Sequence, residues 1–119
     1  MTTSTDLLWE ERPWGGFFTV YSTPQTTVKV LRLNPHSAIS LQYHEERSEF
    51  WTLLTTDALV KFTINGQVLT AEPAVRYYVP RQVIHRIHNL TQRHIEVLEV
   101  IEGRYDENDI VRIHDNYGR

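Results

Sequence analysis

The sequence contains no cysteine, and this absence removes three kinds of chemistry at once. Disulfides, thiolate metal sites and a cysteine nucleophile all need a thiol, so only nitrogen and oxygen ligands could hold a metal. The six histidines are the imidazole ligands available. Glycine is also scarce, with 5 in 119 residues, against a usual share of ~7%. Many turns must therefore be built without glycine.

The sequence also has no excess of basic residues over acidic ones. Lys and Arg number 12 against 15 Asp and Glu, which gives a formal net charge of −3. Nucleic-acid-binding proteins usually show the opposite balance, so we expect no nucleic-acid partner. An anionic small molecule is still allowed, but it would need a local cluster of Arg or Lys.

Long apolar runs are missing too. No segment approaches the ~20 apolar residues of a membrane-spanning helix, and residues 1–12 lack the apolar stretch of a signal peptide. We therefore expect a soluble cytoplasmic protein that does not bind membranes.

The composition suits one compact domain. Of the 119 residues, 40% are hydrophobic and 11% are aromatic, which is enough for a sizeable core. The chain shows no internal repeat, low-complexity tract or linker. We predict a single domain over residues 1–119, in which residues 1–8 form a flexible N-terminus.

Hydrophobic periodicity predicts strands and no helix. Residues 58–64 alternate between apolar and polar side chains, and Asn65-Gly66 follows as a strong hairpin signal. Further short strands are predicted at residues 27–33, 38–44, 49–55, 75–79, 83–89 and 94–101. Many short strands at fairly even spacing are typical of an all-β sandwich or barrel.

Four polar side chains carry the candidate chemistry. Gln42 and His44 lie two apart on a predicted strand and so share a face, Glu49 follows five residues later, and His85 lies on another strand. Such nitrogen and oxygen ligands suit zinc or another first-row divalent ion. The spacing alone leaves a second interpretation open, because a histidine in a strand is more often a surface or hydrogen-bonded core residue.

These residues also carry a resemblance to a known family. The order Gln42-x-His44-x4-Glu49, followed by Pro80-x4-His85-x3-Asn89, resembles the two motifs of the cupins. The chain is more specifically similar to the cupin-type (type II) phosphomannose isomerases, the isomerase half of bifunctional mannose-1-phosphate guanylyltransferase/phosphomannose isomerases. Five segments carry this similarity: residues 12–15 (RPWG), 41–44 (LQYH), 47–51 (RSEFW), 109–112 (DIVR) and 115–119 (DNYGR).

The resemblance implies a fold and an activity. The fold would be a cupin, a double-stranded β-helix or jelly-roll barrel. The activity would be the metal-dependent interconversion of mannose 6-phosphate and fructose 6-phosphate through an enediolate. The nucleotide-transferring domain of the bifunctional enzymes has no counterpart in these 119 residues, so guanylyltransferase activity is not implied.

The family's site residues can be placed on this sequence one by one. The implied ligands of a divalent metal, with zinc the expected ion, are Gln42, His44, Glu49 and His85. Arg47 and Arg112 fall on positions used in catalysis, and together with Lys29 they are the predicted substrate-binding residues. Two structural alternatives remain: Arg112 could tie the tail to the barrel by a salt bridge, and Lys29 could be a solvated strand lysine.

The proton-carrying base and the biological role stay open at this point. Candidate bases are Glu99, Glu45, Glu46 and a metal-bound water. A non-catalytic sugar-phosphate-binding or regulatory cupin is the alternative function, whereas Gln42 argues against a dioxygenase, in which a histidine commonly takes that place. Because the edges of a small barrel are often covered by a second copy, we expect a homodimer.

The sequence departs from the family's pattern at several turns. Two histidines that usually follow His44 are replaced by Glu45 and Glu46. Positions that the family or the general cupin pattern fills with glycine carry other residues: His36, Thr56, Ala74 and Gln82. Since glycine takes a positive φ at little cost, these loops must change conformation or accept strain.

Overall fold

The structure, a computed structural model, describes residues 8–56 and 59–119, and its regular elements there are all strands. The predicted all-β class is confirmed. Within these two ranges, nothing forms a helix of the length and apolar character needed to cross a bilayer. The predicted flexible N-terminus lies, apart from Leu8, outside the described residues.

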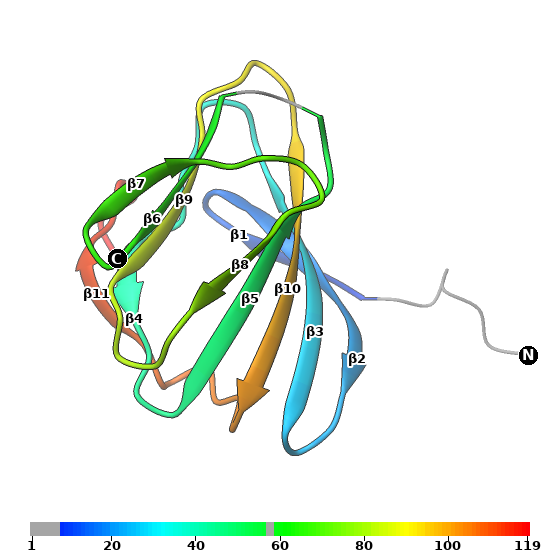
Figure 1. The fold of residues 1–119 in the computed structure, drawn as a ribbon, viewed down its shortest axis with the longest axis vertical. Coiled ribbons are helices and arrows are strands. Elements are labelled where there is room, and N and C mark those ends of the chain that lie inside the picture. Colours follow the sequence, from blue (N-terminus) through cyan, green and yellow to red (C-terminus); the bar gives the residue numbers. More distant parts are fainter. Residues whose placement is uncertain (1–7, 57–58) are drawn as a thin grey trace, which may run out of the picture.

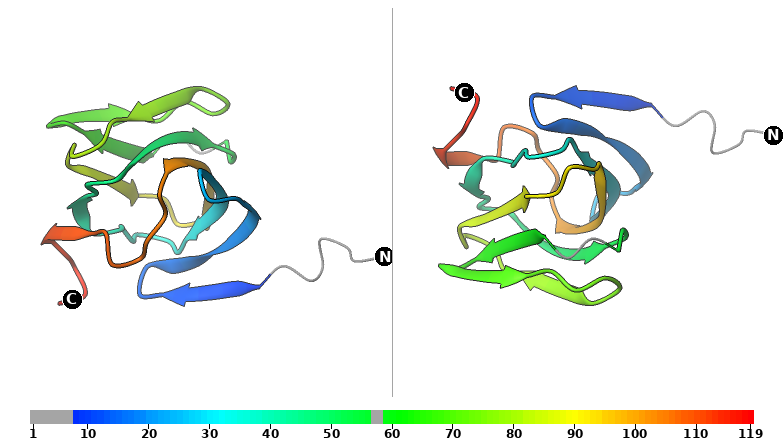
Figure 2. Two further views of the ribbon diagram at one scale, coloured as in Figure 1. Left: turned by 90° about the horizontal axis from the view of Figure 1, so that it is seen from below. Right: turned by 90° about the horizontal axis from the view of Figure 1, so that it is seen from above.

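The strands form two antiparallel sheets that face each other (Figures 1 and 2). In chain order they are β1 (Trp9–Arg12), β2 (Gly15–Ser22), β3 (Thr26–Leu33), β4 (Leu41–Tyr43), β5 (Arg47–Leu53), β6 (Val60–Ile64), β7 (Gln67–Thr70), β8 (Arg76–Val79), β9 (His85–Asn89), β10 (Ile95–Gly103) and β11 (Val111–His114). One sheet has the order β1-β2-β3-β10-β5-β8 and the other β11-β4-β9-β6-β7. Figure 2 looks along the long axis and shows β11 beside β4 at one side of the barrel.

Most predicted strands are found, with shifted ends. The segment predicted at residues 38–44 is the largest deviation, because regular pairing is limited to β4, and Ala38 forms only an isolated bridge with His88. His44 therefore lies just beyond the strand on which it was expected. Four strands were not among the predicted ranges, namely β1, β2, β7 and β11, although the Asn65-Gly66 hairpin signal implied a partner for β6. Their exposure does not alternate regularly, and β11 is exposed throughout, so periodicity gives no signal for them.

The inner face of the barrel is polar at one end and apolar at the other. In β5, alternate residues are buried, and they change from Arg47 and Glu49 to Trp51 and Leu53 along the strand. The neighbouring strands follow the same order, because Lys29 in β3 pairs in register with Glu99 in β10. Towards the apolar end of the barrel, the buried residues of β3 and β10 are hydrophobic. They belong to the core and include Leu31, Leu33, Ile95 and Val97. Strand register thus collects Lys29, Arg47, Glu49 and Glu99 at one end of the barrel.

The replaced glycines show how the turns adapt. His36, Ala74 and Gln82 take φ values of 52°, 65° and 64°, in the left-handed region that favours glycine. Thr56 does not have a positive φ, so its loop has changed conformation. A left-handed conformation costs an L-residue with a Cβ roughly 1–2 kcal/mol. At three of the four positions a residue other than glycine therefore has a positive φ and accepts strain.

Candidate metal centre and cavity

Three buried side chains meet at the polar end of the barrel. His44 follows β4, Glu49 belongs to β5 and His85 begins β9, and one nitrogen or oxygen atom from each lies within 4.8 Å of the others. His44 Nε2 is 3.3 Å from Glu49 Oε2, and His85 Nε2 is 4.0 Å from Glu49 Oε1. Both histidines and the carboxylate are nearly inaccessible to solvent. The cluster could bind a metal ion.

Backbone carbonyls orient both imidazole rings. His44 Nδ1 donates to the carbonyl oxygen of Asp109 at 2.6 Å, and His85 Nδ1 donates to that of Val83 at 2.9 Å. Since a carbonyl only accepts, each ring carries its proton on Nδ1 and directs the Nε2 lone pair at the cluster. Burial lowers the pKa of His44 to about 3 and that of His85 to about 4, so both rings are neutral, as metal ligation requires.

The hydrogen bonding of the Glu49 carboxylate also favours a bound cation. Its Oε1 accepts a hydrogen bond from Trp51 Nε1 at 2.9 Å, whereas its buried Oε2 has no hydrogen-bond partner among the described residues. A buried carboxylate oxygen without a donor is unfavourable, and the charge of Arg47, whose Nε lies 3.1 Å away without a hydrogen bond, offsets this only in part. Two neutral imidazoles and one carboxylate form a nitrogen and oxygen set that matches zinc.

Gln42 lies beside this cluster, opposite His85 in the register of β4 and β9. Its Nε2 is 3.5 Å from His85 Nε2, and its Oε1 accepts from Ser40 Oγ at 2.6 Å. Amide oxygen and nitrogen exchange places when the group turns by 180°. In the turned position Ser40 Oγ accepts from the amide and Oε1 faces the cluster, so the predicted fourth ligand is within reach.

The guanidinium of Arg47 contacts two of these side chains. Its Nη2 donates to His44 Nε2 at 2.8 Å, and its Nε lies 3.1 Å from Glu49 Oε2 at an angle that makes no hydrogen bond. Strand parity predicted that Arg47 and Glu49 share a face, and both are buried in β5. Arg47 therefore touches the ligand atoms and also faces the adjoining cavity.

That cavity has a volume of about 560 Å³ and opens above the cluster. Its wall includes five of the residues predicted from the sequence: Lys29, Gln42, His44, Arg47 and Arg112. The other two predicted residues, Glu49 and His85, are buried against this wall through their contacts with His44 and Gln42. The cavity is large enough for a small organic molecule.

Lys29 is buried rather than solvated. Its Nζ donates to Tyr105 Oη at 2.6 Å and lies 3.9 Å from the centre of the Phe17 ring. Burial lowers the pKa of Lys29, and the charge of Glu99 opposes that shift. The alternative of a solvated strand lysine is therefore wrong, and the amine faces the cavity.

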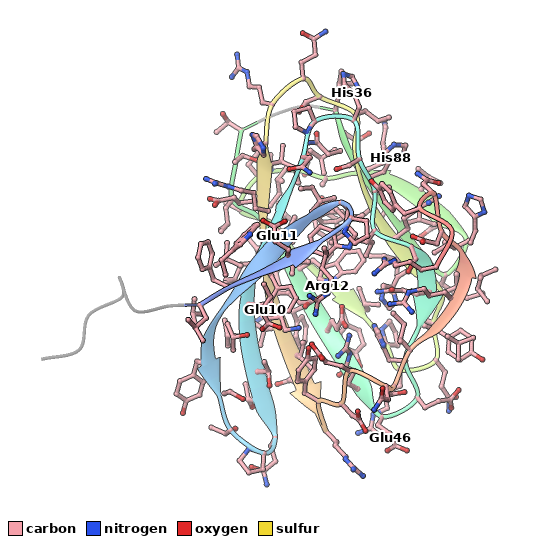
Figure 3. The ribbon with its side chains drawn as sticks, turned by 180° about the vertical axis from the view of Figure 1, so that it is seen from behind. Glu10, Glu11, Arg12, His36, Glu46 and His88 are labelled. Carbon is pink, nitrogen blue, oxygen red and sulfur yellow. The ribbon has the colours of Figure 1, made fainter. Side chains whose placement is uncertain are left out.

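Three arginines from the two ends of the chain gather in the cavity wall: Arg12, Arg112 and Arg119. Arg12, labelled in Figure 3, pairs with Glu107 at 3.0 Å, and Arg119 pairs with Asp115 at 3.2 Å. Arg112 takes part in no ion pair found between described residues, which leaves its alternative role in tying the tail without support. Its pKa is lowered by burial and by the charge of Arg119. The protein thus has a local positive cluster despite its negative net charge.

Sequence reasoning missed Arg12 and Arg119 as parts of the site. Both lie in motifs that carried the family resemblance, at residues 12–15 and 115–119. Their place in these motifs was the one signal that could have suggested a role for Arg12 and Arg119 in the site. Nothing in their spacing, however, predicts that the first and last strands approach the same cavity.

Glu99 is the candidate base that the structure places in the wall. It is buried in β10, and burial together with the charge of Glu49 raises its pKa to about 8. Glu45 and Glu46 are exposed, and neither lines the cavity. In Figure 3, Glu46 lies at one end of the barrel, and His36 and His88 lie towards the other.

Comparison with known proteins gives one family. The family model described as "Mannose-6-phosphate isomerase C-terminal" matches residues 7–115. A mannose-1-phosphate guanylyltransferase of Klebsiella pneumoniae is 36% identical over 109 residues, which are 91% of this chain and 23% of that protein. The xanthan biosynthesis protein XanB of Xanthomonas campestris gives the same identity and coverage. The chain thus spans less than a quarter of the length of these relatives.

Solved structures give the fold. A protein from Planctomyces limnophilus superposes with a TM-score of 0.75 at 18% identity, over 92% of this chain and 93% of that one. The cupin domain of Schizosaccharomyces pombe Cnp3 gives 0.73 at 11% identity, over 85% and 72%. CapF of Staphylococcus aureus gives 0.73 at 19% identity, over 95% and 37%. At such identities the likeness concerns the fold alone, and the predicted cupin barrel is confirmed.

Proposed function

The chain belongs to the mannose-6-phosphate isomerase C-terminal family, and on that premise we propose that it is a metal-dependent aldose–ketose isomerase. Its substrates would be mannose 6-phosphate and fructose 6-phosphate. One observation carries the proposal: the buried cluster of His44, Glu49 and His85 adjoins a cavity of about 560 Å³ whose wall also holds four arginines. A reaction centre and an anion-binding wall thus share one cavity.

The metal would be held by His44, Glu49 and His85, with the turned amide of Gln42 as fourth ligand. Zinc suits this set of nitrogen and oxygen donors. With one carboxylate among neutral ligands, the site would keep a net positive charge. When bound, the ion supplies a Lewis acid that polarises the sugar carbonyl and stabilises developing negative charge on its oxygen.

The phosphate group would be bound by Arg12, Arg112 and Arg119. Arginine presents paired N–H donors that match two phosphate oxygens, and clustering of like charges favours an anionic ligand. Arg112 supports this most clearly because it lines the cavity without an ion-pair partner in the described part of the chain. Lys29 would bind the sugar together with Tyr105, whose hydroxyl oxygen accepts a hydrogen bond from Lys29 Nζ.

Glu99 would move the carbon-bound proton. Isomerisation of the aldose removes the proton from C2 and places one on C1, while the hydroxyl proton passes from O2 to O1. The ionised fraction of Glu99 takes the proton from C2 and delivers one to C1, and between these steps the proton on its carboxyl group exchanges with water that reaches the cavity. Arg47, which reaches both the ligand atoms and the cavity, would donate hydrogen bonds to the enediolate oxygens.

A coupled assay for fructose 6-phosphate tests this function. Zinc-loaded protein should convert mannose 6-phosphate, and chelation or the substitution Glu49→Gln should abolish turnover. The matched control is Glu46→Gln in the neighbouring exposed turn, which should keep most activity. Absence of turnover with any hexose 6-phosphate, in protein that holds its metal, would overturn the proposal. Binding without turnover would favour the non-catalytic sugar-phosphate-binding cupin.

A homodimer remains part of the proposal. The strands β1, β7, β8 and β11 end the two sheets and leave backbone groups unpaired along one side. Such edges are commonly covered by a second copy in symmetric dimers. Sedimentation equilibrium should give twice the chain mass of 14.0 kDa, and a monomer at high concentration would exclude this arrangement.

A further inference from the structure

Asp109 contacts the turn that follows the first histidine of the cluster, and it does so through both backbone and side chain. Its carbonyl oxygen accepts from His44 Nδ1 at 2.6 Å. Its carboxylate accepts from the backbone N–H of Glu45 at 2.8 Å and from that of Glu46 at 2.9 Å. One residue thus binds three consecutive positions directly before Arg47.

The carboxylate is suited to hold this turn. Partial burial favours its neutral form, but the hydrogen bonds from Glu45 and Glu46 outweigh this and keep the pKa of Asp109 below its usual range. Both oxygens are used, one for each N–H. The turn between His44 and β5 is therefore fixed by an acceptor that lies 63 to 65 residues away in the sequence.

The segment around Asp109 also builds the substrate cavity. Tyr105, Glu107 and Arg112 from this segment line the cavity wall. Tyr105 is held by Lys29 at 2.6 Å, and Glu107 is held by Arg12 at 3.0 Å. The same stretch of chain therefore covers the cavity and, through Asp109, orients a ring of the candidate metal centre.

Gly103 permits this segment to leave β10 close to the turn. A Cβ at this position would lie 2.5 Å from the backbone oxygen of Glu46, and the φ of Gly103 is +108°. A side chain there would push the segment away from the turn. The close approach of Asp109 to Glu45 and Glu46 therefore depends on the absence of a side chain at Gly103.

We propose that Asp109 is a positioning residue that couples docking of residues 104–112 to the metal centre. The carboxylate fixes the turn, the fixed turn presents His44 to the carbonyl of Asp109, and this bond favours the Nδ1-protonated tautomer. In that tautomer the lone pair of Nε2, which accepts from Arg47 in this structure, can bind a metal. Metal binding and segment docking then strengthen each other by linkage. The inference rests on the proposed function only for the presence of a metal centre and needs no isomerase activity.

Asp106 offers a matched control in the same segment. Its Oδ1 accepts from the backbone N–H of Asn108 at 2.9 Å, and its carbonyl accepts from that of Asp109 at 2.9 Å. It therefore caps a neighbouring turn by the same type of bond. None of the bonds that the structure shows for Asp106 reaches the His44 turn.

The test measures zinc affinity by competition with a chelator in the wild type and in the variants Asp109→Ala, Asp109→Asn and Asp106→Ala. Removal of such an outer partner typically weakens metal binding 10–100-fold, and we expect this loss for Asp109→Ala. Asp109→Asn keeps one acceptor oxygen, so its zinc affinity should lie between those of the wild type and Asp109→Ala. Asp106→Ala should bind zinc as the wild type does. If Asp109→Ala does not fold, the comparison of Asp109→Asn with Asp106→Asn replaces it.

A second readout separates positioning from a general loss of stability. Imidazole nitrogen NMR of the metal-free protein at pH 7 should show His44 in the Nδ1-protonated tautomer. Asp109→Ala should give a mixture of tautomers, because loss of the turn also loosens Arg47, the donor to His44 Nε2. Zinc should also slow amide hydrogen exchange over residues 104–112 in the wild type but not in this variant. Unchanged zinc affinity, tautomer and exchange in a folded Asp109→Ala protein would overturn the inference. Failure of the wild type to bind zinc would overturn both proposals, whereas zinc binding without isomerisation would affect only the proposed function.

Discussion

The side-chain amide of Gln82 donates a hydrogen bond to the carboxylate of Glu45 at 3.0 Å. Both residues are departures from the family's pattern, which has glycine at the first position and histidine at the second. The backbone N–H of Gln82 also donates to the carbonyl of His44 at 2.7 Å. The two departures thus contact each other beside the candidate metal centre, and Glu45 does not line the cavity.

Strain in the turns predicts that Ala74→Gly stabilises the protein. Ala74 has a φ of 65° and is exposed, so glycine relieves the left-handed conformation without opening a core cavity. The expected gain in the free energy of unfolding is about 1 kcal/mol, measured by urea denaturation. Asn65→Gly is the matched control. Its φ is 52°, but asparagine tolerates this region better, so the gain should be smaller. A loss of stability in Ala74→Gly would contradict the strain argument.

Burial of Glu99 predicts a pH-dependent difference between Glu99→Gln and the wild type in metal-free protein. The pKa of Glu99 is raised from its ordinary 4.5 to about 8, so the folded state retains a proton that the unfolded chain releases. Its contribution to stability is full below pH 4.5 and is lost as the pH rises through about 8.

Glutamine cannot lose a proton, so Glu99→Gln should gain stability over the wild type as the pH rises from 5 to 8. The gain amounts to at most about 1.4 kcal/mol per pH unit. Denaturant unfolding at several pH values in the presence of a chelator measures the difference. A difference independent of pH would show that Glu99 is not held in its neutral form.

The arginine cluster predicts a selective effect of Arg112→Ala. Activity with mannose 6-phosphate should fall at least tenfold, mainly through KM, because one charge-assisted phosphate contact is lost. Zinc affinity and the free energy of unfolding should change little, since Arg112 is exposed and contacts none of the ligand atoms. Arg93→Ala, an exposed arginine outside the cavity wall, serves as control. Normal kinetics in Arg112→Ala would show that Arg112 does not bind the substrate and has a structural role only.

The buried amine predicts that Lys29→Met folds and fails to bind substrate well. Methionine fills the space beside Phe17 and Tyr105 without the desolvation penalty of a charge, so stability at pH 7 should be at least that of the wild type. Binding of mannose 6-phosphate, followed by calorimetry, should weaken. Lys61→Met, on the partly exposed face of β6, should leave binding unchanged. Wild-type affinity in Lys29→Met would remove this residue from the substrate site.

The parts of the site that follow from strand parity were predictable from the sequence. Arg47 and Glu49 are two apart in one strand, and the alternation of β5 places both inside the barrel. Alternation also predicted most strands of the two sheets. The hairpin at Asn65-Gly66 is confirmed by the pairing of β6 with β7, because this pair of residues accepts positive φ at both positions.

The parts that depend on long-range contact were not predictable. Tyr105 meets Lys29 across 76 positions, and Asp109 meets His44 across 65. Such contacts follow from the path of an irregular segment over the barrel, which no local period encodes. The same holds for Arg12, which reaches Glu107 from the opposite end of the chain.

The measurement that tests the account most directly is a proton NMR time course of mannose 6-phosphate in D2O with zinc-loaded protein. We expect fructose 6-phosphate to appear with deuterium at C1, because the proton taken from C2 by a base in the cavity exchanges with solvent before it is returned. The signals should stop growing on chelation and should be lost with Glu99→Gln. Stoichiometric zinc in the protein without either conversion or exchange would contradict the account.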